Sequence, residues 1–292
     1  MFIANDQPDL SVARTAWAVL EPYNAMIYFA PEAREAYKEV GLKGFWMGYF
    51  ASRAAPLGAV SASVVTATFY NFHPRMVARA IPDAWKFSTP ERVWSARVQA
   101  ADKALCRLLE ESITLPELAE AAELAREAVV GCSVVGRTLF AAYSDMKWPE
   151  EPHLVLWHAA TLLREYRGDG HIVALLGEGV DGCEAHVLQG SVGNIARESI
   201  QPHRGWSDEY WQAAEHRMRQ RGLLDKEGRA TASGKALHRA IENRTDWLAL
   251  PPWQHLGEEK YKRLIELVRP LSTCIVDQGG VPMPNPMGSP RP

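Results

Sequence analysis

Long apolar runs and familiar enzyme signatures are both missing from this sequence. The stretch Ala54–Val60 is broken by proline and glycine well before the roughly 18 to 20 apolar residues that span a bilayer. Met1–Leu10 lacks a basic segment followed by an apolar run, so we expect no secretory signal and a cytoplasmic location. No GxSxG, P-loop, GxGxxG or HExxH pattern occurs, and the sequence therefore indicates neither a common enzyme class nor a cofactor.

The sequence also has few cysteines and no excess of positive charge. The four cysteines lie far apart, with no CxxC pair, at Cys106, Cys132, Cys183 and Cys274. This spacing predicts neither a thiolate zinc site nor a disulfide framework, and we expect buried, inert thiols. The net charge of −3 contrasts with the basic domain or stripe that most nucleic-acid binders carry. DNA binding would therefore need a local basic face.

The chain is nevertheless long and apolar enough for a large folded body, and it shows signs of an internal repeat. It has 292 residues, 47% of them hydrophobic. Residues 98–102 resemble residues 211–215, and residues 53–57 align with residues 167–171 at nearly the same spacing. We therefore predict two related units, 25–137 and 138–255, packed as a pseudo-twofold single body. The remaining residues would form an N-terminal arm or helix (1–24) and a C-terminal helix with a Pro/Gly-rich tail (256–292).

Helix-start signals predict a mainly α fold. Thr114 and Asp181 each precede an acidic residue three positions later, which is typical of a capping box. Thr89 is followed by proline, which suits the first turn of a helix, and Ser207 precedes two acidic residues.

One segment predicts a winged helix. Residues 223–225 and 230–233 read as short strands around a glycine turn, between a helix at 210–221 and another from Gly234 to Asn243. In a winged helix, the helix before the hairpin is the recognition helix. The basic residues gathered there are Arg217, Arg219, Arg221, Lys226 and Arg229.

Three segments carry a resemblance to a known family. These are residues 50–58, residues 156–171 and residues 243–253, the last of which contains Asn-Arg-Thr-Asp and Pro-Pro-Trp. They resemble an actinobacterial helix-turn-helix family called SalK-like, over nearly the whole chain. The resemblance implies a helix-turn-helix fold and supplies no catalytic residues.

A second polar cluster supports an alternative function. Its members are Arg53, His158, Arg164, Arg167, Asp169 and His171. The two arginines three residues apart share a helix face and could hold an anion, whereas the histidines and Asp169 could ligate a metal. The structural alternative is that Gly168 ends one helix, Asp169 caps the next and the arginines pair with Glu165 or with backbone carbonyls. Arg53 stands in an apolar neighbourhood and needs a partner, because burying an unpaired charge is costly.

Ten tryptophans are the most conspicuous aromatic feature. Such residues can line a pocket for a flat ligand, but they are more often core residues.

The leading hypothesis is a tandem winged-helix protein that binds DNA and regulates transcription, with a small molecule as a candidate control of that binding. The alternative is a small-molecule-binding protein or enzyme with a cleft between the two units, and a protein-interaction scaffold is a third possibility. The expected partners are DNA or an anionic or aromatic small molecule, with no membrane partner. Self-association remains open.

Overall fold

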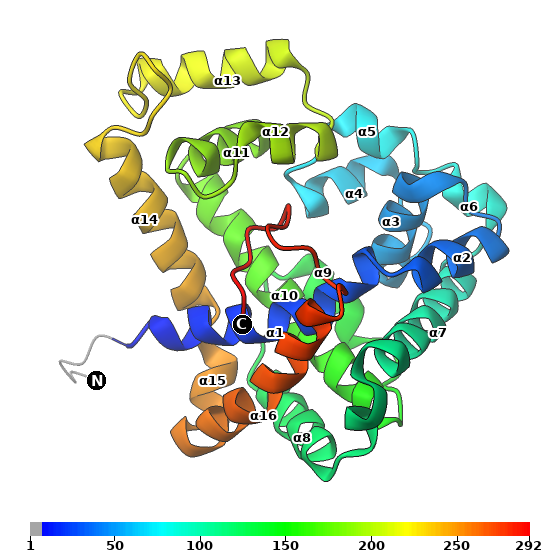
Figure 1. Ribbon diagram of the computed structural model, residues 1–292. Helices are drawn as coiled ribbons and strands as arrows, with labels where there is room; N and C mark the ends of the chain where they lie inside the picture. The colour runs from blue at the N-terminus through cyan, green and yellow to red at the C-terminus, as the bar shows by residue number, and fades with distance from the viewer. Residues whose placement is uncertain (1–7) are drawn as a thin grey trace.

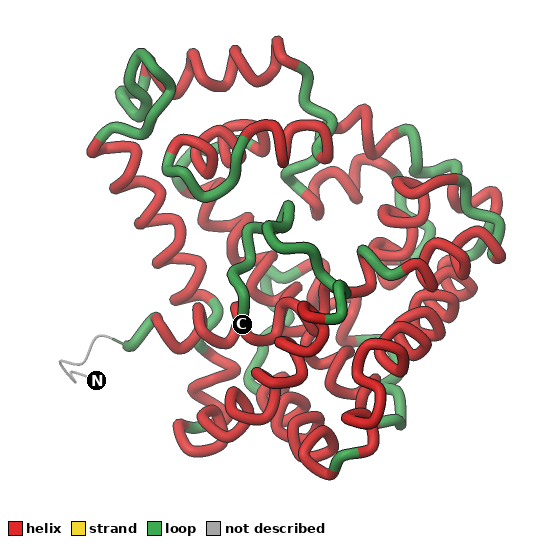
Figure 2. The backbone as a smooth tube through the Cα atoms, in the orientation of Figure 1, coloured by secondary structure: helices red, strands yellow, loops and turns green. Residues whose placement is uncertain are grey.

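Helices form all the regular structure of residues 8–292, the part of the chain that the computed structural model describes (Figures 1 and 2). The mainly α prediction is confirmed. The first seven residues of the expected N-terminal arm lie outside the described part, and the arm then continues as helix α1. None of the described helices is both long and apolar enough to cross a membrane.

The helices follow one another with short connections. The first eight are α1 (Ser11–Ala25), α2 (Pro31–Glu39), α3 (Gly44–Ala54), α4 (Ala62–Phe69), α5 (Pro74–Ala78), α6 (Ala84–Phe87), α7 (Pro90–Leu109) and α8 (Pro116–Val130). The others are α9 (Thr138–Ser144), α10 (Pro152–Gly177), α11 (Gly182–Ser191), α12 (Arg197–Ile200), α13 (Asp208–Gln220), α14 (Ala232–Leu248), α15 (Pro251–Leu256) and α16 (Glu258–Asp277).

Helix α10 organises the molecule. It passes through the middle of the fold and contacts α1, α7, α8, α9 and α14 (Figure 1). Because most of its residues are buried, it is apolar on several sides, as expected for a central helix. The few charged residues on it must therefore find partners inside the protein.

The apolar residues form two cores. The larger extends from Ala13 to Val281 and uses residues of both predicted units, whereas the smaller lies between Ala174 and Ile241. Arg53 ends α3, but its proposed counterpart Arg167 lies in the middle of α10. The pseudo-twofold arrangement therefore finds no support, because the sequence matches compare short helical stretches with different surroundings. The boundary at 137/138 stays a prediction.

The wing was predicted wrongly. Between α13 and α14 the two expected strands are reduced to a single bridge between Leu224 and Ala230. The Asp225 carboxylate accepts hydrogen bonds from the N–H groups of Glu227 and Arg229 and so closes a compact turn. Immediately afterwards Thr231 caps α14, which leaves no residues for a longer second strand.

The helix starts were predicted correctly where the capping side chain binds an N–H group two or three residues further along the chain. Thr89 caps α7, and Asp181 forms a capping box with Glu184 at the start of α11. The Thr114 prediction was wrong, because its hydroxyl donates back to the Glu111 carbonyl and α8 begins at Pro116 without a side-chain cap.

Candidate functional site

The short helix α12 and the longer helix α13 follow one another across a tight turn on the outside of the molecule, in the order that a helix-turn-helix would have. Helix α12 and the 3-10 turn after it end at His203, and α13 begins at Asp208. Between them lie four residues that include Gly205 at φ +74°, a left-handed conformation that favours glycine. A short turn with glycine between two helices is typical of this motif. Helix α11 packs on both helices, and α13 lies at the edge of the fold (Figure 1).

Two hydrogen bonds join the turn between α12 and α13 to the segment between α4 and α5. The Trp206 indole N–H donates to the Asn71 carbonyl over 2.9 Å, and the His73 N–H donates to the Arg204 carbonyl over 2.9 Å. These bonds fix the direction in which α13 leaves the body.

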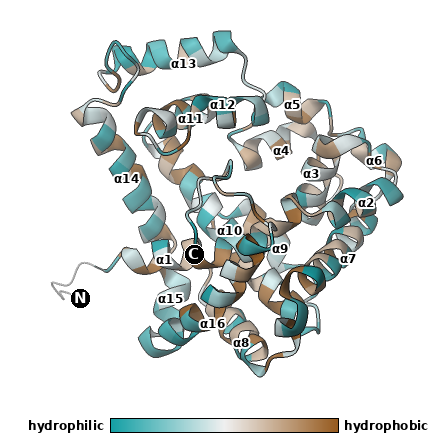
Figure 3. Cartoon of the chain, in the orientation of Figure 1, coloured by the Kyte–Doolittle hydropathy of each residue, from teal (hydrophilic) through white to brown (hydrophobic). Residues whose placement is uncertain are grey.

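The buried and exposed sides of α13 differ sharply. Trp211, Ala214 and Met218 are buried in the smaller core. The opposite side exposes Gln212, His216 and Gln220, which are spaced four residues apart, and Figure 3 shows α13 as largely hydrophilic. None of these three side chains has a hydrogen-bond partner among the described residues. These three side chains add no positive charge, so the pattern of basic residues does not reveal the polar stripe, although its four-residue spacing is visible in the sequence.

The basic residues predicted to contact DNA are mostly paired inside the protein. Arg217 donates to Glu184 over 2.8 Å and to Asp181 over 2.5 Å. Arg219 pairs with Glu215 at 3.0 Å.

The remaining arginines of this set are also engaged. Arg221 donates to the carbonyls of Glu178 and Gly179, and Arg229 pairs with Asp225 and Glu227. Lys226 alone of the predicted set has no partner among the described residues. The electrostatic attraction of this surface for phosphate is therefore much smaller than the count of basic residues predicts.

The predicted ligand cluster splits into separate interactions along α10. Arg53 donates to Glu165 through two nitrogens, over 3.0 and 2.9 Å, and Arg164 donates to Glu165 over 2.8 Å. Although burial acts to raise it, Arg164 and Arg53 together hold the pKa of Glu165 at about 2. Arg53 thus has the partner that its apolar surroundings require. The sequence predicted Glu165 as a partner for the arginines of α10, as Arg164 confirms, but not for Arg53.

Arg167 and His171 face a different helix. Arg167 donates to Asp246 on α14 over 2.9 Å, and His171 is 2.9 Å from the Thr245 hydroxyl. Burial lowers the pKa of His171 to about 4, so its ring is neutral near pH 7. Both residues therefore join α10 to α14.

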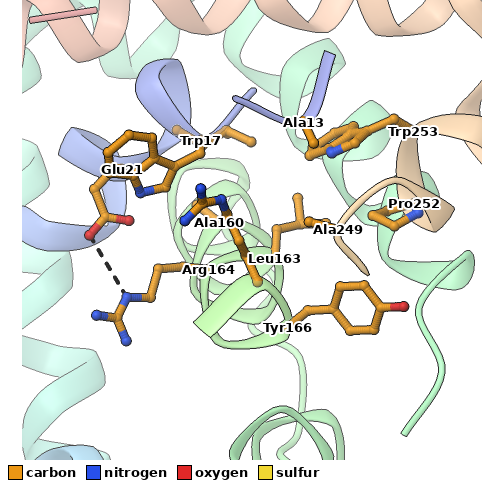
Figure 4. A pocket seen from close by; sticks show the side chains of 12 residues that line it. Ala13, Trp17, Glu21, Ala160, Leu163, Arg164, Tyr166, Ala249, Pro252 and Trp253 are labelled. Atoms are coloured by element: carbon orange, nitrogen blue, oxygen red, sulfur yellow. Dashed lines mark ion pairs between the residues drawn. The ribbon is translucent and has the colours of Figure 1, made fainter. Parts of the chain in front are cut away.

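The arginines of α10 border only a very small cavity. Arg164 and Arg167 line it with Trp17 and Glu21, and Figure 4 shows the Arg164–Glu21 ion pair at its edge. Its volume is about 20 Å³, which is room for about one water molecule. His158 lies elsewhere, against Trp94 and Trp148. The structure therefore does not bring the six predicted residues together in one cleft.

Asp169 is a helix cap, but for a different helix from the one predicted. Helix α10 continues through Gly168, so no helix starts at Asp169. Its carboxylate instead accepts the N–H groups of Leu139 and Phe140, over 3.0 and 2.9 Å, at the start of α9. Burial raises the pKa of Asp169 to about 6.

Replacing Asp169 tests this role. Asn keeps an acceptor oxygen, so Asp169→Asn should melt close to wild type at about pH 4, where the folded protein holds the Asp169 proton, whereas Asp169→Ala should lose about 1 kcal/mol. Because the folded protein binds the Asp169 proton more tightly than the unfolded chain, this group's contribution to stability is lost as pH rises from about 4 to 6. Urea melts across this range should show Asp169→Asn gaining stability relative to wild type. Equal and large losses in both variants at neutral pH would show that the negative charge matters more than the cap.

One cluster has the donor atoms for a metal ion. Asp102, Cys106 and His153 place their ligand atoms within 4.8 Å of one another. The His153 Nε2 is 2.6 Å from the Asp102 carboxylate, and burial raises the pKa of the Cys106 thiol. The Cys106 thiol stays protonated and donates to the Asp102 carboxylate, which also contacts His153. The three side chains therefore have partners without a metal ion, and we assign no metal site to them.

Comparison with known proteins identifies a family for almost the whole chain and does not single out α12 and α13. A protein-family model described as a helix-turn-helix family matches residues 13–282. Neither the curated proteins nor the solved structures show a significant match. The narrower resemblance to actinobacterial SalK-like proteins has no support from these comparisons.

Proposed function

The chain belongs to this helix-turn-helix family, and from that membership we propose that it binds duplex DNA through α13 and regulates transcription. In this motif the second helix enters the major groove and presents side chains to the base edges. We assign this role to α13, one side of which is exposed along its length.

The unpartnered polar stripe on α13 carries the proposal. Glutamine amides pair with adenine in the major groove, and Gln212 and Gln220 expose two amides on one face, with His216 between them. Ala213 is exposed on the same face, and its short side chain lets the helix backbone approach the bases. Exposed polar groups with no internal role are what base readout requires.

The charges around α13 constrain how it would bind. Glu209 is exposed in the first turn and repels phosphates, Asp208 beside it is paired with Arg197, and Lys226 lies just beyond the last turn. The C-terminal half of α13 and the following turn should therefore lie nearest the DNA backbone. Because most nearby arginines are paired, affinity would depend more on base contacts than on general attraction to phosphate.

Binding selection from a random duplex library, followed by fluorescence anisotropy on the enriched sequence, tests this function. Gln212→Ala and Gln220→Ala should each weaken binding by about 1 to 3 kcal/mol, since a good base contact is worth that much. Gln254→Ala changes an exposed glutamine on α15 and serves as the matched control. Failure to enrich any sequence, or equal affinity in all three variants, would refute DNA readout by α13.

A further inference from the structure

A cavity of about 390 Å³ lies between α7 and the segment that leads into α10. Its volume falls in the range of small-molecule sites. Helix α7 is well separated from α13 in Figure 1, so this cavity is distinct from the surface proposed to bind DNA. The lining residues that carry the argument are Trp94, Gln99, Lys147, Trp148, Trp157 and His158.

Aromatic rings form the cavity walls. The Trp94 and Trp157 rings have centroids 6.2 Å apart and planes inclined by only 25°. Trp148 meets His158 edge to face, with centroids 4.7 Å apart. Trp94 and Trp148 are only half-buried, which leaves part of each indole free to contact a flat molecule.

The buried side chains of this cavity have unsatisfied polar atoms. Trp157 is 0% exposed and His158 is 1% exposed, yet Trp157 Nε1 and both ring nitrogens of His158 lack a hydrogen-bond partner among the described residues. Burial lowers the pKa of His158 to about 4, so the neutral ring has one donor and one acceptor near pH 7. Buried polar groups without partners are rare in folded proteins and need an explanation.

Nearby charges narrow the class of ligand. The guanidinium of Arg97 lies 5.5 Å from the Trp157 ring, and that of Arg126 lies 5.0 Å from the Trp148 ring. These cations already contact two of the indoles and would repel a second cation. The exposed rim residues Lys147, Glu150 and Glu151 have mixed charge and do not select an ion of either sign.

We propose that this cavity binds a small, uncharged, planar heteroaromatic molecule. Its ring contacts the indoles of Trp94 and Trp148, and its polar edge exchanges hydrogen bonds with Trp157 and His158. A ligand with both donors and acceptors on one edge supplies the partners that the buried nitrogens lack.

Isothermal titration with two probes tests this proposal. Lumichrome and adenine are planar heteroaromatics that carry donors and acceptors on their edges. Wild type should bind at least one of them saturably and one to one.

Two variants test the lining residues. Trp148→Ala removes a half-exposed indole that lines the cavity, and His158→Phe keeps an aromatic ring but removes both ring nitrogens. Each should weaken binding at least about tenfold, whereas Trp247→Ala, an exposed tryptophan on α14, should change nothing.

Thermal melts of each variant establish that it is folded before titration. If His158→Phe does not fold, Trp148→Ala with its Trp247→Ala control decides the result. No saturable binding of either probe up to about 1 mM, or unchanged affinity in a folded cavity variant, overturns the proposal. The outcome does not depend on whether α13 binds DNA.

Discussion

Replacing Glu165 with Ala should destabilise the protein by about 3 to 5 kcal/mol, because the change leaves a buried cation without its partner. Glu165 is 1% exposed and Arg53 is 7% exposed, so water cannot replace the lost carboxylate. Arg164 also loses its shorter ion pair, since its contact with Glu21 is 3.8 Å. The free energy of unfolding from urea titration measures this loss.

An exposed ion pair gives the matched control for Glu165. Glu120 pairs with Arg263 at 2.7 Å, but both side chains are exposed to solvent. Glu120→Ala should therefore cost less than about 1 kcal/mol. Replacing Arg53 with Met and Glu165 with Leu together should recover part of the stability lost in Glu165→Ala, because Arg53 no longer remains as a buried cation without a partner, whereas Arg164 still loses its ion pair with Glu165. A Glu165→Ala variant as stable as Glu120→Ala would show that the central pair is not a structural requirement.

Replacing Gly234 with Ala should cost about 3 kcal/mol and disrupt the helix-turn-helix unit. Gly234 lies in the first turn of α14, where an added Cβ would overlap the Leu223 carbonyl oxygen. A backbone atom cannot move aside as a flexible side chain can, so the turn after α13 must shift. Leu223 belongs to the smaller core, which also holds the buried face of α13. Thermal unfolding followed by circular dichroism measures the effect.

The neighbouring position supplies the control for Gly234. Ser233 is exposed and has no side-chain partner among the described residues, so Ser233→Ala should leave stability nearly unchanged. If Gly234→Ala melts at the same temperature as Ser233→Ala, the close approach between Gly234 and Leu223 is not needed for stability.

The features that the sequence predicted correctly depend on nearby residues. The caps at Thr89 and Asp181 involve atoms within three positions, and the helix after Ser207 begins as expected. Asp169 shows the limit of such reasoning. Its acceptor role was recognised, but the N–H groups that it binds, those of Leu139 and Phe140, lie about thirty positions earlier and are placed by packing.

The functional residues were harder to predict because their roles depend on distant partners. Arg53 visibly needed an anion, but Glu165 is 112 positions away. The basic residues resemble a DNA-binding surface in the sequence, but Arg217 pairs with Glu184 on α11 and Arg229 pairs with Asp225 in the turn after α13. Trp157 is a core residue, as predicted for most of the tryptophans. Trp94 and Trp148 are half-buried and line a cavity between two segments that are distant in the sequence.

The salt dependence of DNA binding tests most directly whether α13 and the turn after it contact DNA as proposed. Each phosphate contact contributes a slope of about −0.9 to log K against log salt concentration, so one or two contacts should give about −1 to −2. Lys226→Ala should reduce that magnitude by about one, while Arg229→Ala should change it little because Arg229 is already paired with Asp225 and Glu227. No binding at low salt, or a steep slope that Lys226→Ala leaves unchanged, would contradict the account.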